Sequence, residues 1–120
     1  MIEVGHQGGA RGLGEYQVQK IAKLREPVEY QDSEGTKFLF HPILAQIRWK
    51  NTGDLELWFT YYRQREGEKP RFAGQYGPML AENTFIELLS AAIEEGFFSQ
   101  PSLLSLQQVI SKRLGRAKEA

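Results

Sequence analysis

Aromatic and basic side chains are interspersed along a stretch of the sequence that has the pattern of β-strands. Residues 48–71 contain six Lys and Arg residues and four Asp and Glu residues, in a chain whose formal net charge is zero. Trp, Tyr and Arg are the residue types that most often anchor protein interfaces, because they bury a large area and form a hydrogen bond at the tip. We therefore predict a partner-binding surface made by Arg48, Lys50, Trp58, Tyr62, Arg63, Arg65, Arg71 and Tyr76.

The pattern of two strands predicts how this surface is displayed. Residues 43–50 and 55–65 alternate between apolar and polar positions and flank Asn-Thr-Gly-Asp, a sequence typical of a hairpin turn. If the odd-numbered residues of the first strand point into the core, Arg48 and Lys50 point away from it. We expect Trp58 and Tyr62 on that same outer face. A sheet covered on both faces would instead bury both aromatic residues in the core.

The segment 71–78 supplies the last member of the predicted surface. Gly74 and Gly77 flank Gln-Tyr in a β context, which indicates a bulge or a close backbone approach. A bulge would present Tyr76 or Arg71 at a contact. The commoner interpretation is a shaped link between the sheet and the following helix.

The same surface has a second interpretation, which is single-stranded DNA or RNA binding. Bases stack on Trp and Tyr with ~1 to 3 kcal/mol each, while Arg and Lys follow the phosphates. A neutral chain with two surplus cations in this stretch releases few counterions, so nucleic acid would bind weakly. We therefore favour a protein partner, with the chain acting as an accessory or assembly subunit of a larger complex.

Catalytic groups are sparse in this sequence. There is no cysteine, the only imidazoles are His6 and His41, and both aspartates fall in predicted turns, so no set has metal-ligand spacing. No serine follows a strand within Gly-x-Ser-x-Gly, and the glycine-rich residues 8–14 match neither phosphate-binding fingerprint. We expect no enzymatic activity, no cofactor and no metal.

Strand-type patterns precede helical ones along the chain. Residues 28–40 predict a hairpin that Pro42 ends, and residues 71–76 can add a strand after the second hairpin. Thr84 and Glu87 form a capping-box pattern, and Gly96 and Gly115 are placed to end two amphipathic helices. This order predicts an α+β fold: an antiparallel sheet of four to five strands (about residues 28–76) with two C-terminal helices (about 84–95 and 103–114) packed on one face.

The N-terminal quarter is less defined. Five of the twelve glycines lie in residues 1–14, which predicts a flexible tail and leaves residues 15–120 as a single α+β domain. Within residues 15–25, Val18, Ile21 and Leu24 recur every three positions as in a helix, whereas Tyr16, Val18 and Lys20 alternate as in a strand. The good helix formers in this segment favour an N-terminal helix.

Charge and hydropathy also bear on compartment and assembly. No basic region precedes an apolar stretch at the N-terminus and no apolar run is long enough to cross a membrane, so we expect a cytoplasmic protein or one peripheral to a membrane complex. Residues 82–96 hold four Glu and no Lys or Arg, while residues 112–118 hold four cations. The neutral total is therefore a sum of opposed patches. An exposed strand edge or the last amphipathic helix offers a surface for homodimerisation.

Overall fold

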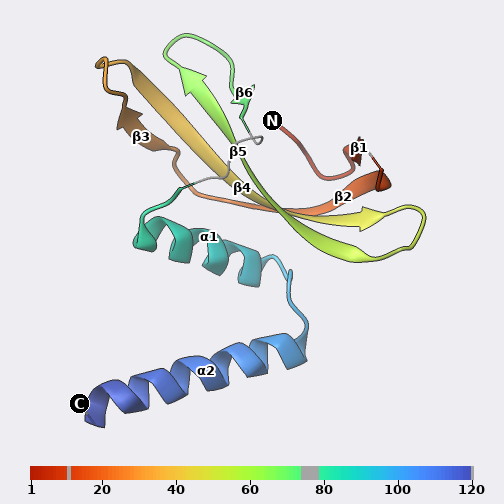
Figure 1. Ribbon diagram of the computed structural model, residues 1–120, viewed down its shortest axis with the longest axis vertical. Coiled ribbons are helices and arrows are strands. Elements are labelled where there is room, and N and C mark those ends of the chain that lie inside the picture. The colour runs from red at the N-terminus through yellow and green to blue at the C-terminus, as the bar shows by residue number, and fades with distance from the viewer. Residues whose placement is uncertain (11, 74–78, 120) are drawn as a thin grey trace.

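The computed structural model describes residues 1–10, 12–73 and 79–119 and has one antiparallel sheet followed by two helices (Figure 1). The strands are β1 (Gln7–Ala10), β2 (Gly14–Lys23), β3 (Val28–Gln31), β4 (Lys37–Trp49), β5 (Leu55–Arg65) and β6 (Arg71–Phe72). The helices are α1 (Glu82–Glu94) and α2 (Gln100–Glu119). The α+β class, with the sheet first and the helices last, is confirmed.

Strand β4 is the centre of the sheet. The strand order is β1-β2-β4-β5-β6, and β3 pairs with the N-terminal part of β4, beside β2. We expected Pro42 to end the strand, but β4 continues through it. Pro42 lies between the residues that pair with β3, which end at Phe40, and those that pair with β2, which begin at Ile43. Among the described strands, Pro42 therefore has no partner strand on that side of β4, so its missing N–H costs no ladder hydrogen bond there.

The predicted N-terminal helix in residues 15–25 is wrong, because this segment is strand β2. A bulge between Val18 and Lys20 explains the misleading spacing. Val18 pairs with Ile47 and Ile21 pairs with Ala45, so the bulge brings two residues three positions apart onto one face. A helical period in the sequence is thus produced by an irregular strand.

The glycine-rich start, expected as a flexible tail, contains strand β1. Its glycines allow close packing, since a Cβ atom at Gly8 would lie 2.5 Å from Tyr16 Oη. Before β1, the Gly5 N–H donates to the Val18 carbonyl and the Val18 N–H donates to the His6 carbonyl, both at 2.8 Å. These hydrogen bonds attach the N-terminal segment to β2.

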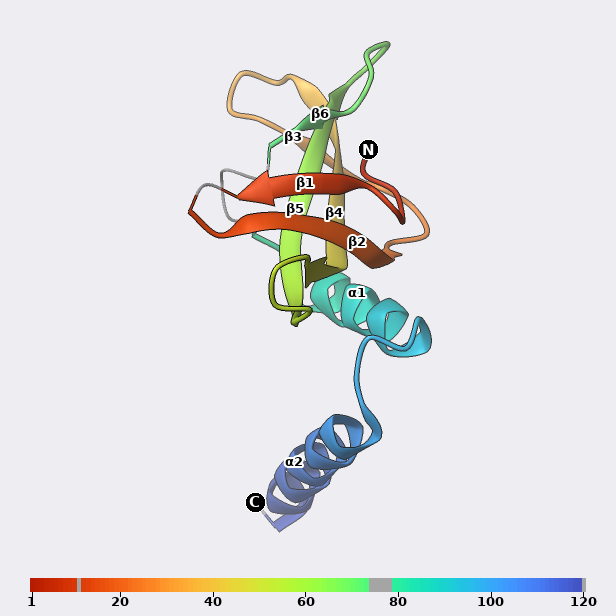
Figure 2. The same ribbon diagram turned by 90° about the vertical axis from the view of Figure 1, so that its right-hand side faces the viewer.

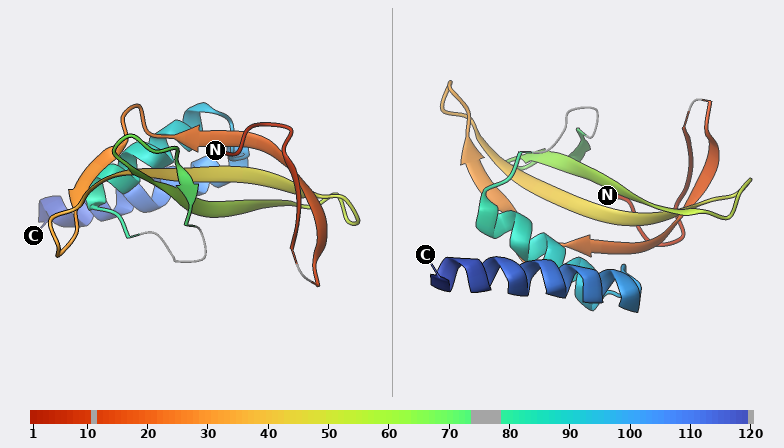
Figure 3. Two further views of the ribbon diagram at one scale, coloured as in Figure 1. Left: turned by 90° about the horizontal axis from the view of Figure 1, so that it is seen from above. Right: turned by 60° about the horizontal axis from the view of Figure 1, so that its bottom comes forward.

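The sheet curls so that one face is concave and the other convex (Figure 3). The N-terminus lies over the concave side, and α1 packs on the convex side against β2 and β4. Ala92 of α1, Ala22 of β2 and the following Phe97 form a buried cluster. Lys20 Nζ donates a 2.7 Å hydrogen bond to the carbonyl oxygen of Gly96 at the end of α1.

The two ends of α1 differ in how well the sequence predicted them. The capping box is not formed, because the helix begins earlier, with Ala81 at the N-cap and no side-chain cap. The left-handed C-cap at Gly96 is confirmed by its φ of 76° and by the hydrogen bond from the Phe97 N–H to the Ala92 carbonyl.

Helix α2 departs from the expected packing. It is longer than predicted and runs through Gly115, and it lies beyond α1, on the side of α1 that faces away from the sheet (Figures 1 and 2). Within residues 1–10, 12–73 and 79–119, α2 packs against no other helix or strand. Of the two helices, only α1 therefore packs on the convex face, and α2 lies outside it.

Candidate functional site

The register of β4 and β5 divides the predicted surface between the two faces of the sheet. Residues directly opposite each other in an antiparallel pair share a face. Ala45 lies opposite Trp58, and Arg48 lies opposite Leu55. Trp58 and Tyr62 therefore lie on the concave face and Arg48 on the convex one, so the expected common face is wrong. The reason is the parity of the connection, because a shift of one residue exchanges the faces of a whole strand.

The concave face carries an open groove of about 610 Å³, which we call the aromatic groove. Its aromatic lining consists of Tyr16, Trp49, Trp58, Tyr62 and Phe72. The Tyr16 ring lies edge-on to both Trp49 and Trp58, with 5.7 Å between ring centroids in each pair. Trp49 is buried and Trp58 is half-buried. Tyr62 is buried as well, and its Oη accepts a 3.0 Å hydrogen bond from the Ile2 N–H. Tyr62 thus acts as a core residue, the alternative considered for a sheet covered on both faces.

Burial raises the pKa of Tyr16 above its usual value, and the neighbouring Tyr62 raises it further. A raised pKa means that this environment favours the neutral phenol over the phenolate. The surroundings of the Tyr16 hydroxyl therefore disfavour negative charge.

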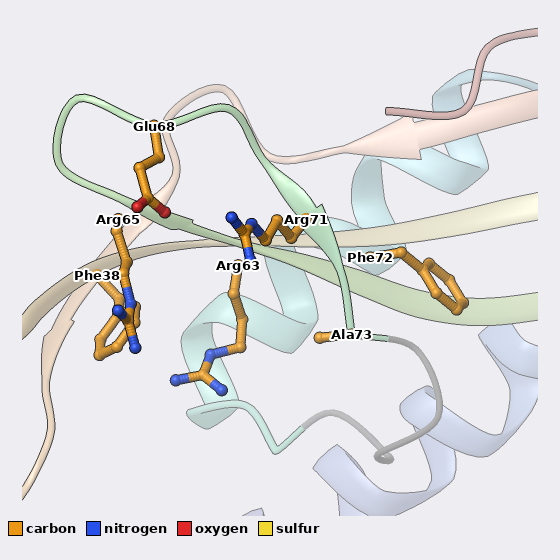
Figure 4. A pocket seen from close by; sticks show the side chains of 7 residues that line it. All are labelled: Phe38, Arg63, Arg65, Glu68, Arg71, Phe72 and Ala73. Carbon is orange, nitrogen blue, oxygen red and sulfur yellow. The ribbon is translucent and has the colours of Figure 1, made fainter.

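Three arginines gather on the convex face, where the ends of β5 and β6 lie beside β4 (Figure 4). Arg63 and Arg71 lie opposite each other in the β5–β6 pair, and Arg65 lies opposite Phe38 in the β4–β5 pair. We call Arg63, Arg65 and Arg71 the arginine cluster. They line a shallow pocket of about 330 Å³ together with Phe38, Glu68, Phe72 and Ala73.

Aromatic rings hold two of these guanidinium groups. The guanidinium carbon of Arg63 is 4.5 Å from the Phe38 ring centroid, and that of Arg65 is 5.4 Å from it. Arg63 Nε donates a 2.9 Å hydrogen bond to Tyr30 Oη, and the Tyr30 ring stacks on Phe38. Cation–π contacts of this kind order an arginine while leaving its terminal nitrogens available.

The arginine cluster is not neutralised within the described part of the chain. Glu68 is the one acidic residue that lines the pocket. The only ion pair among the described residues joins Lys50 and Glu15, at 3.4 Å. Guanidinium groups gathered in this way bind carboxylate or phosphate oxygens through paired, charge-assisted hydrogen bonds.

The remaining predicted residues have other places. Arg48 Nη1 donates a 2.7 Å hydrogen bond to the Gly53 carbonyl in the β4–β5 turn. Lys50 Nζ donates to Gln7 Oε1 at 2.7 Å and so links the turn to β1. Both residues therefore hold local structure. Tyr76 lies outside the described residues.

Sequence reasoning missed Phe38 and Tyr30, which support the arginine cluster. The signal that could have found them is the aromatic content of the first predicted hairpin, which has Tyr30 in one strand and Phe38 in the other. What could not be predicted was that β4 extends through Pro42 and that its first residues pair with the end of β5, which sets Phe38 opposite Arg65.

His41, one of the two imidazoles, lies in β4. His41 Nε2 is 2.8 Å from Gln64 Oε1, in a side-chain hydrogen bond. In the described ranges, no three His, Asp or Glu side chains lie together as a metal site would need, and no helix is long and apolar enough to cross a membrane. Comparison with protein-family models, with curated proteins and with solved structures finds no match.

Proposed function

We propose that this protein is a non-enzymatic binding module, an accessory or assembly subunit whose arginine cluster docks on an acidic segment of a protein partner. The observation that carries the proposal is the set of three arginines that line one pocket without an ion pair among the described residues, two of them with the guanidinium group over the Phe38 ring. Arginine clusters are a recurrent means of recognising acidic motifs. Phe38 and Tyr30 support two of the cations in advance, which lowers the entropy lost on binding.

The division of the faces favours a protein partner over single-stranded nucleic acid. Base stacking requires exposed aromatic rings beside the cations that follow the phosphates. Trp58 lies on the concave face, away from the arginine cluster. Phe38 is only 5% exposed beneath the guanidinium groups, and Tyr30, which is 37% exposed, has one face of its ring stacked on Phe38. Phe72, which is 49% exposed, lies opposite Tyr62 and so belongs to the concave face. Carboxylates of an acidic peptide need no such stacking surface.

A titration with a labelled hexaglutamate peptide, followed by fluorescence anisotropy, tests the proposal. The native chain is compared with the Arg63→Gln/Arg71→Gln double variant and with Arg48→Gln as a matched control, because Arg48 bonds only to its own turn. We expect the double variant to lose at least about tenfold in affinity, as for the loss of charge-assisted hydrogen bonds, and the control to bind as the native chain does.

Salt and a second ligand sharpen this experiment. Binding of the peptide should weaken as ionic strength rises, because the cations are largely exposed. A thymidine oligonucleotide of the same charge should bind no more tightly than the peptide. Equal peptide binding by the native chain and the folded double variant would overturn the proposal, and tighter oligonucleotide binding that depends on Trp58 would favour nucleic acid instead.

A further inference from the structure

Helix α2 presents an apolar stripe that nothing in the described part of the chain covers. Leu103, Leu106, Ile110 and Leu114 fall on one side of the helix at spacings of three and four. The last three are 36%, 50% and 59% exposed. Most of the stability of a helix in a protein comes from packing of its apolar side, so a partner that covers this stripe would stabilise α2.

Helix α1 has a second uncovered stripe. Its inner side packs on the sheet through Leu88 and Ala92. Its outer side carries Phe85, Ile86 and Ile93, which are 46%, 52% and 36% exposed. The two helices therefore offer two apolar surfaces of similar kind.

The link between the helices holds α2 clear of α1 of its own chain, although α2 runs back beneath α1 (Figure 1). Phe97 is buried against Ala22 and Ala92, and Phe98 packs on that cluster. Gln46 Nε2 donates to the Phe97 carbonyl at 3.3 Å. Ser99 Oγ then accepts a 3.4 Å hydrogen bond from the Ser102 N–H in the first turn of α2, and the described residues of α2 make no close contact with α1 of the same chain.

Charge makes the two helices complementary. Helix α1 carries Glu82, Glu87 and Glu94 and no Lys or Arg, whereas α2 carries Lys112, Arg113 and Arg116. We propose that two copies of this chain associate about a twofold axis, with α2 of each copy packed on the outer side of α1 of the other. Such an isologous arrangement sets each acidic helix against a basic one twice.

Exposed apolar side chains of α1 and α2 supply the apolar centre that such a dimer needs. Across α1 and α2 each chain exposes eight large apolar side chains, and a pair of chains doubles that set. A stable interface buries about 1,600 Å² in total, with an apolar centre and a charged rim. These residues are Phe85, Ile86, Ile93, Leu104, Leu106, Val109, Ile110 and Leu114.

Sedimentation equilibrium of the full chain tests the proposal. We expect twice the monomer mass of 13.7 kDa at micromolar concentration. Ile110→Glu should raise the dissociation constant at least tenfold, whereas Gln108→Glu, which adds the same charge on the opposite side of α2, should leave it unchanged. A monomer at all concentrations would overturn the proposal, as would equal effects of the two substitutions.

Cross-linking separates exchange between copies from folding back within one. The chain has no cysteine, so introduced thiols are the only ones. An equimolar mixture of Ser90→Cys and Gln107→Cys chains, treated with a short bismaleimide, should give a covalent dimer between the two variants. Linkage within a single Ser90→Cys/Gln107→Cys chain, with no dimer, would overturn the proposal. This result does not depend on the arginine cluster, so it leaves the proposed function untouched.

Discussion

The guanidinium carbon of Arg63, on β5, lies 4.5 Å from the centre of the Phe38 ring, on β4. This cation–π contact links the two neighbouring strands. Tyr30, from β3, completes the support by accepting the 2.9 Å hydrogen bond from Arg63 Nε. The orientation of Arg63 is thus set by three strands, β3, β4 and β5. Support of this kind distinguishes a prepared binding site from exposed arginines that happen to be near one another.

Removing the Tyr30 hydroxyl tests this support. Tyr30→Phe keeps the ring on Phe38 and deletes only the acceptor for Arg63 Nε. A hydrogen bond of this class contributes about 0.5 to 1 kcal/mol, so hexaglutamate affinity should fall roughly two- to fivefold with no change in fold. Anisotropy titrations measure the change, and an unaltered affinity would show that Tyr30 does not position Arg63.

Thr60 is a buried group whose replacement should stabilise the protein. It is fully buried in β5, and its Oγ1 has no hydrogen-bond partner within the described residues. Thr60→Val removes that unpaired hydroxyl at nearly constant shape and should raise the free energy of unfolding by about 1 kcal/mol. Urea unfolding measures it. As a control, Thr52→Val should lower stability slightly, because Thr52 Oγ1 accepts the Asp54 N–H at 3.2 Å.

Two glycines near the helices should respond to alanine with opposite signs. Gly96 has φ of 76°, so Gly96→Ala strains the C-cap of α1 and should lower the free energy of unfolding by about 1 to 2 kcal/mol. Gly115 lies inside α2 and a Cβ there meets nothing within 4 Å. Gly115→Ala should raise helix content by removing a residue of poor propensity. Circular dichroism during thermal unfolding reports both effects.

Tyr16 predicts how stability depends on alkaline pH. Burial and then Tyr62 raise the pKa of Tyr16 in the folded chain above its unfolded value of about 10. The unfolded chain therefore loses this proton first, and the stabilisation by the neutral phenol is present below pH ~10 and lost as pH rises through the folded pKa. Tyr16→Phe should make the decline of stability above pH ~10 shallower than in the native chain. Unfolding curves at several pH values measure this, and parallel declines would contradict the assignment.

Much of the architecture could be predicted from local patterns, because each of those patterns depends on residues close together in sequence. The β4–β5 hairpin follows from its turn residues, and the Gly96 cap from a glycine after an amphipathic helix. Segment 15–25 could not be predicted, because the bulge after Val18 imitates a helical period and its strand depends on pairing with distant β4. The expected strand end at Pro42 is wrong for a related reason. A proline fits within β4 because the strand changes partner there from β3 to β2, which local sequence does not reveal.

For the candidate site, too, the local features could be predicted and those that depend on strand pairing could not. The residue types were identifiable, and Arg63, Arg65 and Arg71 do lie together. Their separation from Trp58 could not be predicted, since one residue more or less in the β4–β5 connection would exchange the faces. The support from Phe38 likewise depends on register, which a single strand pattern does not reveal.

The most direct test of the arginine cluster as the binding site is an NMR titration that observes side-chain N–H signals. The arginine Nε–H and tryptophan indole N–H resonances of the ¹⁵N-labelled chain are followed as hexaglutamate is added. We expect the Arg63, Arg65 and Arg71 signals to shift with a common dissociation constant, while the Arg48 and Trp58 signals do not move. Shifts confined to Trp58 in the aromatic groove, with the three arginine signals unchanged, would contradict it.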